Sequence, residues 1–98
     1  MEERYHYAQV THSVQLDCEA HFGIDNTMSL SWYFEERNIY NYNKGCVEYP
    51  VGESKYHVER NDQNFILHIK NVTLVDGGVY KCLTISEAKS TKLQVFGE

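Results

Sequence analysis

The stretch that decides the fold is residues 76–82, Asp76-Gly77-Gly78-Val79-Tyr80-Lys81-Cys82. Its first three residues predict a turn, because aspartate hydrogen-bonds to nearby backbone and glycine adopts positive φ without steric cost. We expect a strand to follow, from about residue 79 to residue 85. Successive side chains of a strand point to opposite faces, so Tyr80 and Cys82 share one face and Lys81 lies on the other.

Two further β-rich segments precede this stretch. Residues 14–22 alternate between apolar and polar side chains without a break, and Cys18 is one of the apolar members. Residues 28–34 form an apolar and β-rich run around Trp32, and we expect a strand from about residue 28 to residue 35. Both segments have the composition and the length of strands.

Cys18, Trp32 and the motif Asp-x-Gly-x-Tyr-x-Cys at 76–82 together resemble an immunoglobulin-superfamily domain, and the resemblance covers nearly all 98 residues. It implies an all-β fold, an immunoglobulin-like antiparallel β-sandwich with Greek-key topology, as a single domain over residues 1–98. It also implies a Cys18–Cys82 disulfide between the sheets, Trp32 packed on it, and a Tyr80 hydroxyl bonded to nearby backbone. The separation of Trp32 from Cys82 favours the variable set, with features of the intermediate set elsewhere.

The remaining strands follow from patterning and from the resemblance. We expect them at residues 5–10, 39–42, 47–51, 55–60, 65–70 and 91–96. One sheet would contain 5–10, 14–22, 65–70 and 55–60, and the other would contain 91–96, 79–85, 28–35 and 39–42. The inward side chains after residue 64 are expected to be Phe65, Leu67, Ile69 and Val72.

The resemblance also suggests a structural role for Lys55. The family has a basic residue at the start of the strand that corresponds to 55–60, and Lys55 matches it. An ion pair between Lys55 and Asp76 would close the bottom of the sandwich. The usual family residue is arginine, which binds a carboxylate through two parallel hydrogen bonds, so Arg60 remains a rival partner for Asp76.

Composition limits the classes of function. The formal charge is −5 at pH 7 without a run of lysines or arginines, which argues against a nucleic-acid or anionic-membrane surface. No apolar stretch is long enough to span a bilayer, so this segment is not expected to insert into a membrane. Its start lacks a signal-peptide pattern, as in a mature or trimmed segment. No nucleophile with a base, metal cluster or cofactor motif is apparent, so we predict neither an enzyme nor a cofactor.

The three cysteines bear on the compartment. If Cys18 and Cys82 pair, Cys46 is left as a reduced half-buried thiol, as a disulfide to another chain, or as the partner of a cysteine outside this segment. A disulfide that closes a loop of about 64 residues would stabilise the fold by roughly 4 kcal/mol, and such disulfides persist in oxidising compartments. We therefore expect an extracellular location, as a secreted protein or as the ectodomain of a membrane protein.

Residues 71–73, Asn-Val-Thr, form the only N-glycosylation sequon in the chain. The sequon lies between a predicted strand and a predicted turn, where exposed asparagines occur. Asn71 is therefore a candidate glycosylation site, and a glycosylated Asn71 would fit a secretory route.

The predicted hairpin of residues 55–70 brings two histidines together. If Arg60 pairs with Phe65 across the turn, His57 pairs with His68 on the outer side of the sheet. Two histidines at that separation could bind a metal ion or repel each other when protonated. Two exposed histidines without a role are favoured, because no further ligand is apparent.

The candidate binding site is the sheet that contains 91–96, 79–85, 28–35 and 39–42, which is the usual recognition face of the family. Alternation predicts its outward side chains, which are the candidate partner-binding residues Tyr33, Glu35, Lys81, Leu83, Ile85, Gln94 and, depending on register, Tyr40 or Tyr42. The outward side of 14–22 is polar instead, with Gln15, Asp17, Glu19 and His21. Apolar clusters with a polar rim are typical of protein interfaces.

The sequence thus predicts a recognition domain that binds another protein, either a copy of itself in cell adhesion or a receptor or ligand. Two alternatives stay open. One is a structural immunoglobulin domain in a multidomain scaffold, including an intracellular one with reduced cysteines. The other is a secreted or pathogen-encoded decoy receptor domain. The fold does not decide among them, because function depends on the site.

Overall fold

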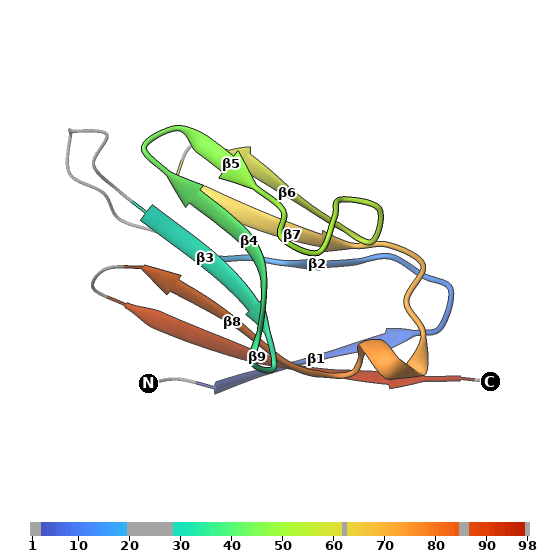
Figure 1. Cartoon of the computed structure of the whole chain (residues 1–98). Coiled ribbons are helices and arrows are strands. Elements are labelled where there is room, and N and C mark those ends of the chain that lie inside the picture. The colour runs from blue at the N-terminus through green and yellow to red at the C-terminus, as the bar shows by residue number, and fades with distance from the viewer. Residues whose placement is uncertain (1–2, 20–28, 62, 85–86, 98) are drawn as a thin grey trace.

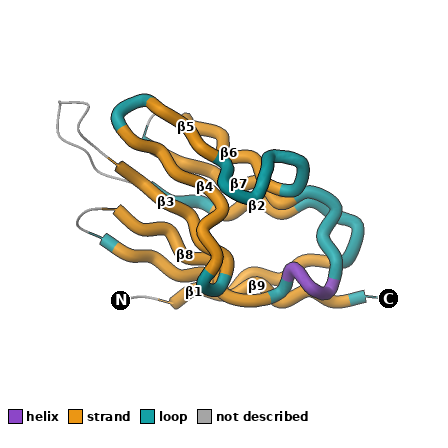
Figure 2. Tube along the Cα trace, in the orientation of Figure 1, coloured by secondary structure: helices purple, strands orange, loops and turns teal. Residues whose placement is uncertain are grey.

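The structure, a computed structural model, describes residues 3–19, 29–61, 63–84 and 87–97. The strands in these ranges form two layers (Figure 1). They are β1 (Glu3–Gln9), β2 (Val14–Leu16), β3 (Ser29–Phe34), β4 (Arg37–Asn43), β5 (Cys46–Glu48), β6 (Tyr56–Asn61), β7 (Asn64–Ile69), β8 (Gly78–Thr84) and β9 (Ala88–Phe96). One 3₁₀ turn, η1 (Leu74–Asp76), precedes β8 and is purple in Figure 2. No helix in these ranges is long and apolar enough to cross a membrane.

The two layers are sheets of unequal size. The larger sheet has the order β1-β9-β8-β3-β4-β5, and the smaller has the order β2-β7-β6. The described pairings are antiparallel apart from β1 with β9, which run parallel. The predicted all-β immunoglobulin-like sandwich is confirmed.

The expected position of the first strand is wrong. Residues 5–10 are not paired with 14–22 in one sheet, since β1 pairs with β9 and places Tyr5 opposite Lys92. Alternation identifies the inward side chains of an edge strand, but it does not identify the sheet edge that receives the strand. The short connection between β1 and β2 carries the chain from one sheet to the other.

Inward side chains of both sheets build the core. Cys18 and Cys82 form the predicted disulfide, with their Cα atoms 6.4 Å apart. Trp32 lies opposite Cys82 on the neighbouring strand and is fully buried. The predicted inward residues of 65–72 have no exposed surface; they are Phe65, Leu67, Ile69 and Val72.

The end of the sandwich that contains η1 has the predicted polar contacts. The Tyr80 hydroxyl donates to the Asp76 carbonyl oxygen at 2.8 Å. The Lys55 Nζ atom lies 2.7 Å from Asp76 Oδ2, which confirms the predicted ion pair. The same carboxylate oxygen accepts the Thr73 N–H at 2.8 Å. The rival Arg60 instead donates to the Tyr42 hydroxyl at 2.9 Å.

Gly78 is required by the turn that starts β8. Its φ is +151°, and a Cβ atom there would lie 2.5 Å from Glu35 Oε2 and 2.8 Å from the Phe34 ring. The Glu35 carboxylate occupies this space because it accepts the Val79 N–H at 2.7 Å. The absence of a side chain at Gly78 therefore leaves room for the Glu35 carboxylate, which comes from the β3–β4 turn.

Several predicted boundaries differ from the structure. The strand expected at 14–22 is regular only in β2, although Cys18 exchanges two backbone hydrogen bonds with Phe65, at 2.8 and 3.1 Å. Residues 20–22 of that prediction lie outside the described residues. β9 begins at Ala88 rather than at residue 91, because the Thr84 N–H already bonds to the Glu87 carbonyl oxygen at 2.8 Å.

The strand expected at 47–51 is also shorter and earlier than predicted, since β5 ends at Glu48. The Gly52 N–H donates to the Tyr49 carbonyl oxygen at 3.0 Å and closes a turn. Pro50 lies inside this turn, where its missing N–H costs no ladder hydrogen bond.

Replacing Lys55 with methionine is expected to lower the free energy of unfolding by about 1 kcal/mol. The buried Asp76 carboxylate would lose its cation and keep the Thr73 N–H, and the loss stays moderate because the Lys55 side chain is 32% exposed. Denaturant unfolding at pH 7 measures the change. Lys70→Met, at an exposed lysine, is the control and should change stability by less than about 0.5 kcal/mol. Equal stability of the two variants would contradict a contribution from the ion pair.

Stability should fall above pH 10. Burial raises the pKa of Tyr40 to about 12 and also raises the pKa of Tyr56 and Tyr80. Unfolded tyrosines ionise near pH 10, so above that pH the folded state holds more protons and loses stability as pH rises towards about 12. Thermal melts between pH 8 and 11.5 measure this loss, which Tyr40→Phe should reduce. A melting temperature that is constant through pH 11 would contradict it.

Candidate functional site

The outer faces of the two sheets differ in composition. On the six-stranded sheet, the outward side chains include a set that we call the tyrosine face: Tyr5, Tyr7, Tyr33, Val79, Lys81, Leu83, Lys92, Gln94 and Phe96. On the three-stranded sheet, the outward side chains include Gln15, Asp17, Glu19, His57, Glu59 and His68. One face is therefore aromatic and apolar with two lysines, and the other is polar with three carboxylates.

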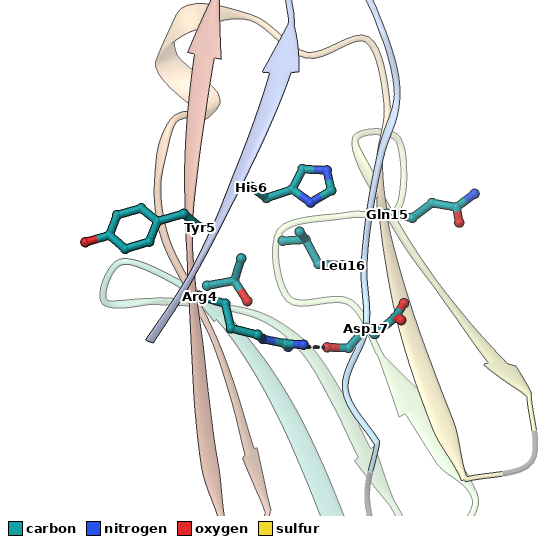
Figure 3. Close-up of a pocket in the computed structure, with 7 residues that line it drawn as sticks. Arg4, Tyr5, His6, Gln15, Leu16 and Asp17 are labelled. Atoms are coloured by element: carbon teal, nitrogen blue, oxygen red, sulfur yellow. Dashed lines mark hydrogen bonds between the residues drawn. The ribbon is translucent and has the colours of Figure 1, made fainter. Parts of the chain in front are cut away.

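Edge strand β1 supplies the most exposed aromatic side chains of the tyrosine face. Tyr5 is 57% exposed and Tyr7 is 66% exposed, and Phe96 on β9 is 54% exposed. Figure 3 shows Tyr5 on the side of β1 opposite His6, pointing away from the space between the sheets. Tyr7 lies opposite Gln94 in the parallel ladder, so aromatic and polar side chains are neighbours across the two strands.

The central strands β3 and β8 continue this face. Tyr33 pairs with Lys81, and both are half-buried on the outer side. Leu83 is also half-buried, and Gln94 on β9 is exposed. These four residues lie on the side of the sheet that alternation predicts.

Tyr40 and Tyr42 do not lie on the tyrosine face, so this part of the prediction is wrong. Tyr40 pairs with Trp32, and Tyr42 pairs with Leu30. Directly paired side chains share a face of the sheet, and both partners point inward. Tyr40 is accordingly 2% exposed, and the Tyr42 ring meets the Phe65 ring edge-on at a centroid distance of 5.3 Å.

Asparagines occupy the outward positions of β4 in place of the tyrosines. Asn41 Oδ1 accepts a hydrogen bond from Ser31 Oγ at 2.7 Å. Its Nδ2 atom donates to Asn38 Oδ1 at 2.7 Å and to Glu48 Oε1 at 3.0 Å. This polar network borders the tyrosine face on the β4 side.

The two other predicted face residues have different outcomes. Glu35 lies in the β3–β4 turn with φ at +57°, and its carboxylate accepts the Val79 N–H. It is exposed, but it stabilises the turn rather than extending the sheet face. Ile85 lies outside the described residues.

The sequence reasoning missed the contribution of β1. The order Tyr5-His6-Tyr7-Ala8 already places both tyrosines on one side of a strand. The prediction that this strand belongs to the other sheet separates its tyrosines from Tyr33 and Leu83. The parallel pairing of β1 with β9 brings them to the same face.

A cleft of about 230 Å³ separates β1 from β2 (Figure 3). His6 and Leu16 point into it, and Gln15 points away from it. The Arg4 guanidinium reaches across and donates from Nη2 to the Asp17 carbonyl oxygen at 3.1 Å. This hydrogen bond joins β1 to the residue that follows β2, across the gap between the two sheets, so we assign the cleft a structural role.

The predicted pairing of His57 with His68 is confirmed, with ring centroids 6.0 Å apart. His57 Nδ1 lies 2.8 Å from Glu53 Oε2, and His68 Nε2 lies 3.0 Å from Glu59 Oε1. Within the described ranges, no group of three or more His, Cys, Asp or Glu residues is arranged to hold a metal ion. The four side chains form two histidine–carboxylate pairs at the surface.

Cys46 lies on β5 as an exposed free thiol. Of the three alternatives for Cys46, the half-buried thiol is wrong as to burial, and the exposed thiol remains open to pairing with a cysteine of another chain or outside this segment. β5 is a short edge strand, and Cys46 pairs with Asn43, which is also exposed. Among the described strands, β5 is the last of its sheet, so Cys46 lies at the sheet edge.

Comparison with known proteins gives one family and a common fold. The family described as Immunoglobulin V-set domain matches residues 2–96. No curated protein sequence matches the chain. Many solved structures do match it.

Three of these structures illustrate the range. A chain of the crystal structure of Dpr1 IG1 bound to DIP-eta IG1 has a TM-score of 0.80 and 22% identity, over 98% of this chain and 92% of that one. A structure from work on the multimeric cell-adhesive interactions of VGSC beta subunits has a TM-score of 0.79 and 17% identity, over 98% and 93%. Titin domain I81 has a TM-score of 0.73 and 18% identity, over 97% and 89%. At these identities the likeness concerns the fold.

Thiol titration of the domain from its native source should find one reactive thiol. Cys46 is exposed and free, whereas Cys18 and Cys82 are joined and buried. Reduction under denaturing conditions should raise the count to three. The Cys46→Ser variant should give none before reduction. Three reactive thiols in the native protein would instead indicate a reducing compartment and favour an intracellular scaffold.

Proposed function

This chain belongs to the immunoglobulin V-set family, and from that premise we propose that it is an extracellular recognition domain that binds another protein through the tyrosine face. The binding would serve cell adhesion or receptor–ligand pairing. The fold is generally non-enzymatic, and the proposal requires no cofactor.

The observation that carries the proposal is the exposure of Tyr5 and Tyr7 on the same sheet face as Tyr33, from which the strands β9 and β8 separate them. Together with Phe96, the β1 tyrosines leave more than half of their surface in water. Tyrosine is favoured at interfaces because it contributes a large contact area at a low entropic cost and keeps a hydroxyl for hydrogen bonding. Large exposed apolar patches with a polar rim are typical of protein interaction sites.

Charge indicates the chemistry of the partner. Lys81 and Lys92 lie among the aromatic side chains of the tyrosine face, although the chain as a whole has a charge of −5. A complementary surface would be apolar at its centre and would carry carboxylates opposite these lysines. A standard interface takes about 800 Å² from each partner, which one face of a sheet can supply.

The disulfide supports an extracellular location. Cys18–Cys82 lies in the core, and structural disulfides form and persist in oxidising compartments. The domain would then be secreted or form part of the ectodomain of a membrane receptor. The alternative of an intracellular scaffold predicts reduced cysteines instead. Titin domains are among the structures that share the fold.

A second immunoglobulin domain is the first partner to test, and a second copy of this chain is the simplest case. Among the structural neighbours, Dpr1 IG1 is bound to another such domain, and the VGSC beta subunits are described through multimeric cell-adhesive interactions. These interactions belong to those proteins. For this chain they are the reason to test another immunoglobulin domain before other partners.

Sedimentation across a concentration series tests self-association, and binding of a labelled oligomer of the domain to cells of its source tests a separate partner. Tyr7→Ala and Tyr33→Ala, each shown to be folded, should weaken association at least about tenfold, because each removes an aromatic anchor. His57→Ala changes an exposed ring on the opposite sheet and should leave binding unchanged. If both tyrosine variants bind as the wild type does, the tyrosine face is not the binding site.

A further inference from the structure

The β1–β2 connection and the segment between β7 and η1 lie side by side at one end of the sandwich (Figure 1). Residues of both segments line a groove. Its volume is about 480 Å³. None of its lining residues carries a charge, and they are Val10, Thr11, Asn71, Val72, Thr73, Leu74 and Val75. The groove shares no residue with the tyrosine face.

Backbone hydrogen bonds fix the two walls of the groove. The Thr11 N–H donates to the Val72 carbonyl oxygen at 2.8 Å, and the Val72 N–H donates to the His12 carbonyl oxygen at 2.9 Å. In η1, the Asp76 side chain is buried and accepts the Thr73 N–H. The turn that directs the Asp76 side chain inward directs the side chains of the two preceding residues, Leu74 and Val75, into solvent.

Those two residues, Leu74 and Val75, are apolar and strongly exposed, at 59% and 82%. Single exposed apolar side chains are ordinary, but two in succession beside an uncharged groove form a surface that a covering group would remove from water.

Asn71, the sequon asparagine, is itself part of the groove wall. It is exposed, and its φ is +50°, in the left-handed region that asparagine tolerates better than most residues. Its carbonyl oxygen accepts a hydrogen bond from Lys55 Nζ at 3.0 Å. The backbone is thus held where a sugar attached to Asn71 would start at the edge of the groove.

We propose that Asn71 carries an N-linked glycan whose first N-acetylglucosamine units lie in this groove and cover Leu74 and Val75. The C–H face and the acetamido methyl group of this sugar are apolar and suit the side chains of the groove. Its hydroxyl groups remain towards water. The covalent attachment identifies the occupant, because the linkage begins on the wall of the groove itself.

The attachment is a group transfer carried out by the glycosylation machinery of the cell, with a lipid-pyrophosphate oligosaccharide as donor. The Asn71 amide nitrogen forms a bond to the anomeric carbon of the first sugar and loses a proton. The bond from that carbon to the pyrophosphate oxygen breaks, and the lipid pyrophosphate leaves with the electron pair. The inference rests on the secretory location proposed above and is independent of the tyrosine face.

The test compares three forms of the domain secreted by eukaryotic cells. One keeps its glycan, one is trimmed by an endoglycosidase to a single N-acetylglucosamine, and one is treated with an amidase that removes the glycan and leaves aspartate at position 71. Complete removal should lower Tm by on the order of 4 °C. The trimmed form keeps the first sugar, so its Tm should lie at least half of this difference above the Tm of the form without a glycan. The Asn71→Asp variant provides the same unglycosylated chain without enzyme treatment.

A variant of the groove distinguishes stabilisation by contact between the glycan and the groove from a general effect of the glycan on stability. In Leu74→Ser/Val75→Ser, removal of the glycan should shift Tm by less than about 1 °C. Val47→Ser changes an exposed valine on β5 and should respond as the wild type does. Equal losses in the wild type and the groove variant, no loss in either, or an unmodified Asn71 would overturn the proposal. Partner binding is measured separately, so its failure leaves this comparison valid.

Discussion

The buried carboxylate of Asp76 is the constraint on which one end of the sandwich depends. A carboxylate removed from water needs partners, and Lys55 and the Thr73 N–H supply them. The same residue accepts the Tyr80 hydroxyl through its carbonyl oxygen, so the turn before β8 is tied to the core. Tyr80 in turn stacks on Phe34, with ring centroids 4.6 Å apart. The position of β8, and with it that of Cys82 and the disulfide, follows from these contacts.

The tyrosine face results from two choices of pairing. β1 joins β9 and turns Tyr5 and Tyr7 outward, whereas the pairing of β4 with β3 turns Tyr40 and Tyr42 inward. Some tyrosines of this chain therefore point into the core, and others point into solvent. The inward tyrosines fill the core, and burial raises the pKa of Tyr40 to about 12. The outward tyrosines of β1 are more than half exposed and form an aromatic surface.

Residues whose contacts are local or follow strict alternation could be predicted from the sequence. The turn between β6 and β7 sets the register of His57 with His68, and the 76–82 stretch sets the environment of Tyr80. The outward placement of Tyr33 and Leu83 also follows from alternation. The choice of sheet for β1 could not be predicted, because it depends on which distant edge is open. A register shift after Trp32 also breaks simple counting between β3 and β4.

The parallel pairing of β1 with β9 has a mechanical consequence. Glu3 at the start of β1 lies opposite Ser90, and Phe96 at the end of β9 lies opposite Gln9, so the chain enters and leaves at opposite ends of this pair. Tension applied between the two ends therefore acts along the strands. The hydrogen bonds between β1 and β9 are then loaded in shear. They resist the force together, instead of breaking one after another as they would if the strands were peeled apart.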